Sequence, residues 1–176
     1  MEQSNLRLMT IEEFDRLPED NTKTYELIDG KLVMQARPNV RHQAIMSNLT
    51  QKIANYLDKK PCRVFTEVEL EISKNVIVPD VSVLCSIENL NIQRFTQPPV
   101  LVIEILSPSN TANEINNKIN KYKNHGIKEC WVIDPDLKSV EVKDLETNIS
   151  INYIQSGLVK SDIFDDLHIE LSKIFE

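Results

Sequence analysis

The sequence predicts one α/β (α+β) domain in which helices flank a mixed β-sheet. Two short segments, residues 76–84 and 100–106, are almost wholly apolar and rich in β-branched side chains. Such runs are typical of strands that are buried on both faces. Two longer segments, which begin at Asn39 and Thr111, repeat apolar residues at helical spacing and open with residues that cap helices.

The length and composition of the chain limit the class of protein. Its 176 residues, 41% of them hydrophobic and 27% charged, fit a single domain over residues 1–176. No segment approaches the ~20 apolar residues of a membrane span, and the first residues lack the basic-then-apolar pattern of a secretory signal. We therefore expect a cytoplasmic protein with no membrane partner. Three widely spaced cysteines, Cys62, Cys85 and Cys130, predict free thiols in a reducing compartment.

The charge of the chain is unevenly distributed. The net charge of −7 argues against a protein that coats nucleic acid. Residues 37–63 nevertheless carry six basic side chains and one acid, and residues 112–128 carry four lysines and one glutamate. Residues 129–176 carry eleven acids and four lysines. The two basic stretches could meet a polyanion, or they could be ordinary solvated helix faces.

The N-terminal part predicts a short helix and a hairpin. Thr10 opens a capping-box pattern, and the helix that follows ends at Pro18. Asp29-Gly30 lies between two apolar runs, which is a strong hairpin signal. Glu26 lies in the first strand of this hairpin.

The middle of the chain predicts a long helix and a two-strand unit. The helix runs from Asn39 to about Leu57, with His42 in the first turn of its apolar stripe. A histidine there is most often a packed or capping residue, and the alternative is a polar group near a site. Residues 63–72 alternate polar and apolar side chains, so we expect a strand that pairs through a turn with the apolar run at 76–84. The glutamates of the alternating strand predict a solvated face, with Glu67 as an outside candidate for a site.

The second half predicts a helix followed by a series of strands. Thr111 and Glu114 form a second capping box, and the helix ends at Gly126. Lys118 lies at the border of the apolar stripe of this helix, where its head could reach the ends of the strands. Further strands are expected at residues 129–134, 139–142 and 149–154, with a loop at 86–99 and a closing strand or helix at 167–175.

Each of the two apolar strands carries one carboxylate, Asp80 and Glu104. An ionised carboxylate in such a place is costly unless it is paired, hydrogen-bonded or bound to a metal. Mg²⁺ takes oxygen ligands, usually one or two carboxylates together with waters and substrate phosphates. A lysine such as Lys118 could stabilise the charge that develops on a phosphate under attack. Together these residues would suffice to hydrolyse a phosphodiester.

Each of these residues also has an ordinary structural reading. Glu104 could be satisfied by a local partner, and Asp80 could be a residue of a turn after proline. Glu26 near a hairpin could face water. Lys118 lies four residues after Glu114 and could form a common helix ion pair worth a few tenths of a kcal/mol.

An ordered set of short motifs resembles the Uma-type endonuclease family, long catalogued as a domain of unknown function, and is similar to the PD-(D/E)XK restriction-endonuclease-like superfamily. The resemblance extends from Met9 to Phe175. It is carried by Tyr25-Glu26-Leu27-Ile28-Asp29-Gly30, His42-Gln43, Pro79-Asp80, Glu104-Ile105-Leu106-Ser107-Pro108-Ser109, Lys118 with Tyr122, Gly126-Ile127 and Trp131-Val132-Ile133-Asp134-Pro135.

The resemblance implies a restriction-endonuclease-like core, a Mg²⁺ or Mn²⁺ cofactor and DNA as the substrate. Asp80 and Glu104 would be the metal ligands, and Glu26 an accessory acid. The superfamily places a lysine two residues after the glutamate, where this chain has Leu106. In this family the lysine is moved to the following helix, which makes Lys118 the matching residue. The resemblance also implies a homodimer, since duplex DNA has two strands to cut.

Three hypotheses about function remain open from the sequence. The first is a metal-dependent DNA endonuclease that uses Glu26, Asp80, Glu104 and Lys118. The second is a catalytically inactive nuclease fold that works as a DNA- or protein-binding module. The third is a hydrolase that uses paired carboxylates on another substrate, and the basic stretches argue modestly against it.

Overall fold

A computed structural model describes residues 7–18, 23–35, 38–108 and 110–176. Its largest sheet has six strands in the order β10-β9-β8-β7-β6-β3. Neighbours in this sheet pair antiparallel except β7 and β8, which are parallel, so the sheet is mixed. The predicted fold class, a mixed sheet flanked by helices, is confirmed. The strands are β3 (Cys62–Thr66), β6 (Val81–Cys85), β7 (Leu101–Ile105), β8 (Glu129–Asp134), β9 (Ser139–Asp144) and β10 (Ser150–Ile154).

Two smaller sheets complete the strands of the described residues. The four-stranded sheet has the order β2-β1-β5-β4 and contains the predicted hairpin, which turns at Asp29 and Gly30 with positive φ values of 52° and 73°. The C-terminal segment forms a strand and then a short 3₁₀ helix. The bounds are β1 (Thr24–Ile28), β2 (Lys31–Gln35), β4 (Leu70–Ile72), β5 (Asn75–Ile77), β11 (Leu158–Lys160), β12 (His168–Glu170) and η1 (Leu171–Lys173).

The helices begin at the residues that their caps predict, although α1 ends at Phe14, earlier than the expected end at Pro18. The α-helices are α1 (Ile11–Phe14), α2 (Val40–Leu57) and α3 (Ala112–His125). Thr10 and Thr111 form complete capping boxes with the glutamate three residues later. The Asn39 side chain caps α2 by accepting a hydrogen bond from the backbone N–H of His42. Gly126 ends α3 in the left-handed conformation, with φ of 91°.

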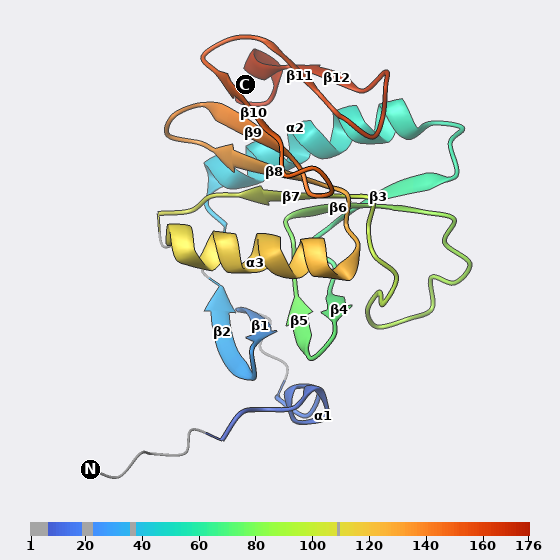
Figure 1. Ribbon diagram of the computed structural model, residues 1–176, viewed down its shortest axis with the longest axis vertical. Helices are drawn as coiled ribbons and strands as arrows, with labels where there is room; N and C mark the ends of the chain where they lie inside the picture. Colours follow the sequence, from blue (N-terminus) through green and yellow to red (C-terminus); the bar gives the residue numbers. More distant parts are fainter. Residues whose placement is uncertain (1–6, 19–22, 36–37, 109) are drawn as a thin grey trace.

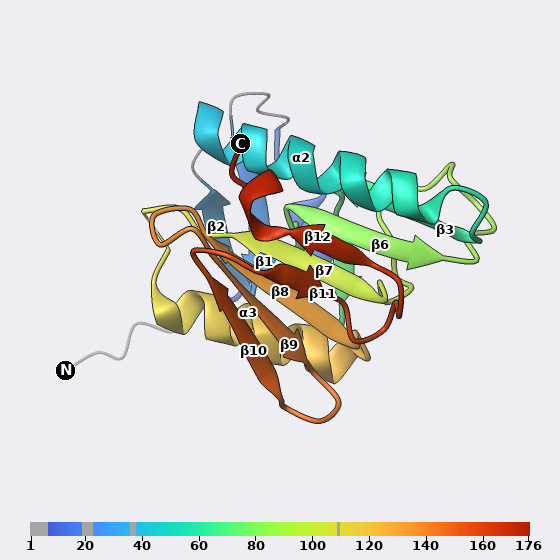
Figure 2. The same cartoon turned by 90° about the horizontal axis from the view of Figure 1, so that it is seen from above.

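The two long helices cover opposite faces of the six-stranded sheet, α2 above it and α3 below it in Figure 1. Figure 2 shows the same order from above, with the C-terminal strands on the side of α2. Along β7, Leu101, Ile103 and Ile105 pack in the core beneath α2, whereas Val102 packs with α3. Because side chains alternate along a strand, Glu104 points toward α3. Among the helices described, none is long and apolar enough to cross a membrane.

Two expected strands are each broken in the structure. The apolar run at 76–84 divides into β5 and β6, which belong to different sheets, and the alternating run at 63–72 divides into β3 and β4. Pro79 lies at the first break, where its lack of an N–H prevents continuous pairing. Glu67 lies at the second break with φ of 50°. The breaks lie side by side, because the Glu67 N–H donates to the Asp80 carbonyl at 3.1 Å.

The expectation of three free thiols is wrong for two of the cysteines. Cys62 and Cys85 form a disulfide, and Cys130 is a free, buried cysteine. The two bonded residues face each other in the register of β3 and β6. They are 23 positions apart in sequence, and only the pairing of these strands brings them together. Sequence spacing alone therefore carried no signal for the bond.

We expect Cys62→Ser to lower the free energy of unfolding of the oxidised protein by about 3 kcal/mol, because the bond restricts the unfolded chain. Urea denaturation without reductant measures the change. As the control, dithiothreitol should lower the denaturation midpoint of the wild type and leave that of Cys62→Ser unchanged. Equal midpoints for the oxidised wild type and the variant would contradict a stabilising role for the disulfide.

Candidate active site

Glu104 is a buried carboxylate whose partners both come from α3. It is the fourth residue of β7 and only 5% exposed. Its Oε1 accepts a hydrogen bond from the Tyr122 hydroxyl, and its Oε2 lies 3.4 Å from Lys118 Nζ. Lys118 and Tyr122 are four residues apart and so lie on one side of the helix. One helix therefore supplies both groups that compensate the buried charge.

Lys118 also joins Glu104 to a second buried carboxylate, that of Glu26 in β1. Lys118 Nζ lies 2.8 Å from Glu26 Oε1, and the Glu26 side chain is fully buried. The same Oε1 accepts a hydrogen bond from the Val78 N–H at 2.8 Å, and the Gln35 side chain donates to Oε2. The β1–β2 hairpin, α3 and β7 thus meet at one ammonium group. The alternative that Glu26 faces water is wrong.

Burial and the neighbouring charges shift the pKa values in this cluster. Burial raises the pKa of Glu104 from the ordinary 4.5 to about 7, with smaller increases from Asp80 and Glu26 and an opposing effect from Lys118. Burial would by itself lower the pKa of Lys118, but Glu104 and Glu26 raise it above its ordinary value. The pKa of the Tyr122 hydroxyl is raised well above its ordinary range, first by burial and then by the nearby carboxylates. Lys118 and Tyr122 therefore stay protonated at neutral pH.

Asp80 lies between β5 and β6, directly after Pro79, and completes the group of predicted site residues. Its Oδ2 accepts a hydrogen bond from the Ile105 N–H at 2.6 Å, which places Asp80 beside the strand end that carries Glu104. Its side chain is 18% exposed, more than that of Glu26, Glu104 or Lys118. Asp80 is therefore the member of the group that is most open to solvent.

His42 contacts Asp80 from the opposite face of the sheet. It is in the first turn of α2 and is 8% exposed, and its Nε2 lies 3.2 Å from Asp80 Oδ1. Burial lowers the pKa of His42, but the neighbouring Asp80 carboxylate raises it above the ordinary value. Its Nδ1 has no hydrogen-bond partner among the described residues. The reading of His42 as a polar group near the site agrees with this placement.

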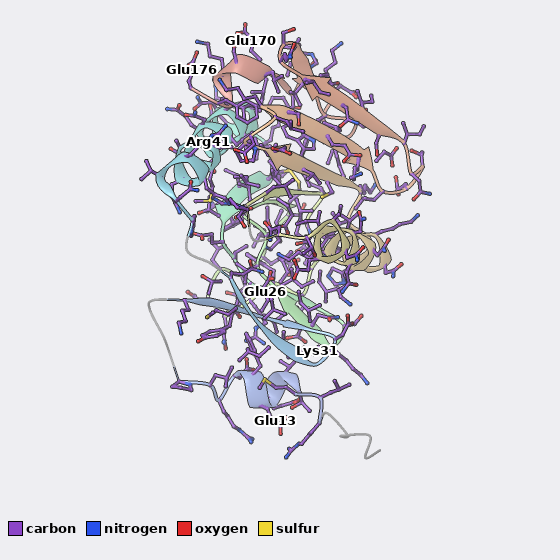
Figure 3. All side chains as sticks on the ribbon, turned by 90° about the vertical axis from the view of Figure 1, so that its left-hand side faces the viewer. Glu13, Glu26, Lys31, Arg41, Glu170 and Glu176 are labelled. Atoms are coloured by element: carbon purple, nitrogen blue, oxygen red, sulfur yellow. A yellow bond between two sulfur atoms is a disulfide. The ribbon has the colours of Figure 1, made fainter. Side chains whose placement is uncertain are left out.

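These side chains line or underlie a cleft of about 520 Å³. Figure 3 looks onto this end of the molecule, with Glu26 between the β1–β2 hairpin and the larger sheet and Arg41 at the start of α2. Among the described residues, five carboxylates line the cleft, against two cations, Lys118 and Arg41. The described lining is Thr24, Gln35, Pro38, Asn39, Arg41, His42, Glu67, Val78, Asp80, Glu104, Ile105, Leu106, Ser107, Pro108, Asn110, Lys118, Asp134, Pro135 and Asp136.

Residues 11–171 match the protein family described as "Uma2: Putative restriction endonuclease". The match covers most of the chain. The chain belongs to the Uma2 family.

Two further similarities agree with this family. The chain resembles the crystal structure of a putative nuclease belonging to DUF820 from Anabaena variabilis, with a TM-score of 0.85 and 28% sequence identity over 95% of this chain and 97% of that one. It is also 26% identical over 125 residues to an uncharacterized protein of Synechocystis sp.. That second match covers 69% of this chain and 66% of the relative. The family and the solved structure support a nuclease-like function.

A divalent metal in this Uma2 protein would be held by Asp80 and Glu104. No group of three His, Cys, Asp or Glu residues suited to a metal occurs in the part of the chain that the structure describes. A site with two carboxylates, completed by waters and a phosphate, is the usual arrangement for Mg²⁺. Both carboxylates line the same cleft, and its excess of acids favours a cation. The donor set therefore fits a hard divalent ion.

The structure adds residues to the site that the sequence did not single out. The Gln35 side chain donates a hydrogen bond to Glu26 across the hairpin. A glutamine in a strand has no sequence feature that would have predicted this contact. Tyr122, which the sequence names only beside Lys118 in a family motif, donates its hydroxyl to Glu104. Its position four residues after Lys118 places it on the same side of the helix, and this spacing was the sequence signal for its contact with Glu104. Glu67 lines the cleft but makes only a backbone contact with Asp80.

We expect Lys118→Met to destabilise the protein by about 3 kcal/mol at pH 8, because it leaves two buried carboxylates without their cation. The pKa of Glu104, about 7, is above its ordinary value, so the folded state binds the extra proton and stability falls as pH rises from 4.5 to 7. Loss of the lysine raises this pKa further, and the destabilisation should therefore be smaller at pH 5. Urea denaturation at both pH values measures it.

Lys123→Met provides the control, because Lys123 is an exposed lysine on the same helix. It should change stability little at either pH. An equal loss of stability at pH 5 and pH 8 in Lys118→Met would contradict the assigned charge pairing.

Proposed function

We propose that this Uma2 protein is a metal-dependent endonuclease that hydrolyses phosphodiester bonds of DNA. One observation carries the proposal: Asp80 and Glu104 meet at one end of neighbouring strands, beside Lys118, in an acidic cleft. The family match and the likeness to the solved structure described as a putative nuclease support it. Mg²⁺ or Mn²⁺ would be the cofactor, bound by the two carboxylates.

In this proposal the residues of the chain have separate roles. When bound, the metal would supply a Lewis acid that polarises the phosphate and lowers the pKa of a water molecule. Asp80 is oriented for binding by the Ile105 N–H, and Glu104 by the Tyr122 hydroxyl. Lys118, kept protonated, would stabilise negative charge that develops on the phosphate.

Glu26 has a supporting role in the same proposal. Its two oxygens are held by the Val78 N–H and the Gln35 amide, so its position is determined before substrate arrives. Its ion pair with Lys118 places the ammonium next to Glu104. Glu26 would therefore orient Lys118 rather than bind metal.

One observation favours a second candidate, a nuclease fold that binds DNA or protein without cutting it. Lys118 is 8% exposed and is paired with two carboxylates, as in a purely structural ion-pair cluster. This candidate predicts salt-sensitive binding that survives the loss of Asp80 and Glu104. The two experiments below separate the candidates.

We also propose that the protein acts as a homodimer in the cytoplasm. A two-fold dimer would present two sites to the two strands of duplex DNA, and sedimentation velocity of the free protein would test it. In a reducing cytoplasm Cys62 and Cys85 would be thiols.

Isothermal titration of Mn²⁺ is expected to show binding to the wild type that vanishes in Asp80→Ala, because one of the two carboxylates is lost. Asp165→Ala is the control, since Asp165 is an exposed acid on the loop after β11, outside the cleft lining. The titration is repeated with a short duplex, because some sites bind metal only when a phosphate is present. Binding of equal strength to Asp80→Ala would refute the metal assignment.

Cleavage of plasmid DNA in Mg²⁺ is expected to fall by about a hundredfold or more in Asp80→Ala. Asp165→Ala should cut at the rate of the wild type. Circular dichroism confirms that each variant is folded. Undiminished cleavage by Asp80→Ala would contradict the proposed mechanism. DNA binding without cleavage by the wild type would favour the binding module.

A further inference from the structure

Arg41 lines the cleft and is held by the turn between β8 and β9. It is the second residue of α2, and its Nη1 lies 2.8 Å from Asp136 Oδ1. Its Nη2 also donates to the Pro135 carbonyl. These partners belong to the turn between β8 and β9, which Asp134 orders by accepting backbone hydrogen bonds at 2.8 and 3.0 Å. The guanidinium group thus joins the start of α2 to the β8–β9 turn, and both segments line the cleft.

Arg41 is also the accessible cation of the described lining. Lys118, the other cation, is 8% exposed and pairs with two buried carboxylates, whereas the Arg41 side chain is 47% exposed. The helix that carries Arg41 contains no acidic residue along its 18 positions. The positive end of the helix dipole adds to the charge of the guanidinium at this point. An anion that enters the cleft would therefore meet Arg41 first.

The partner of Arg41 is one that an incoming anion could replace. The Asp136 side chain is 82% exposed, and ion pairs so open to water contribute little to stability. A guanidinium group offers a planar set of donors that fits a phosphate as well as a carboxylate. Asp136 therefore occupies Arg41 with an anionic group that accepts from a guanidinium as a phosphate does, and little stability is lost when it leaves.

We propose that Arg41 binds a backbone phosphate of the DNA at the entrance of the cleft, and that Asp136 occupies its guanidinium group until DNA replaces it. This inference rests on the proposed function and adds a substrate-positioning residue to it. It assigns a role to the Arg41 guanidinium group, which lines the same cleft as the proposed metal ligands and Lys118.

Fluorescence anisotropy with a labelled DNA duplex tests the inference in the full-length protein. Ca²⁺, which also takes oxygen ligands, is present to offset the acidic lining. Affinity is measured over a range of salt concentrations for the wild type, Arg41→Gln, Asp136→Asn and the double variant. Arg63→Gln and Asp165→Asn are matched controls, since both residues are exposed and outside the described lining.

Arg41→Gln should weaken binding about tenfold and lower the salt dependence by about one phosphate contact. Asp136→Asn should strengthen binding roughly threefold, because the competing carboxylate is gone. This gain should disappear in the double variant, since the two substitutions act on one contact. The control variants should bind as the wild type does, and thermal melting should show all proteins folded.

Two results would overturn the inference alone: wild-type affinity in Arg41→Gln, or an equal gain from Asp136→Asn with and without Arg41. In either case the wild type still binds DNA, and the proposed function stands. If the wild type binds no duplex at any salt concentration, the assignment of DNA fails, and this inference fails with it.

Discussion

The buried carboxylate of Glu104 is the constraint on which the rest of this structure depends. It lies on a central strand, on the face that α3 covers, where an unpaired charge would be strongly unfavourable. Lys118 and Tyr122, both on α3, compensate this charge by an ion pair and a hydrogen bond. Glu26, which belongs to a separate sheet, forms a second ion pair with Lys118. Polar contacts, in place of apolar packing, therefore join α3, β7 and the β1–β2 hairpin at this point.

The breaks in two strands make the rest of the site possible. Had the run through Val78 and Asp80 continued as one strand, Asp80 would be paired within a sheet and closed to solvent. Instead the chain leaves one sheet and enters another, and Asp80 lies at the start of the new strand with its carboxylate on the Ile105 N–H. The most exposed carboxylate of the cluster is thus at the junction of the two sheets.

Much of the fold could be predicted from the sequence, because caps, periodicity and turn residues are local signals. The helix that bears Lys118 begins at its predicted cap, and the hairpin turns at Gly30. The ion pair of Lys118 with Glu26 joins distant segments and left no local trace, and the disulfide of Cys62 and Cys85 left none either. The motifs of a family placed Glu26 and Lys118 in one site where spacing alone could not.

The capping box at Thr111 has a consequence for how this protein can vary. It determines where α3 starts, and Lys118 and Tyr122 follow seven and eleven residues later, close to two and three full turns of a helix. A residue inserted or deleted between the cap and Lys118 would rotate both side chains by about 100° around the helix axis. This stretch should therefore tolerate exchange of its outward side chains while its length stays constant among working relatives.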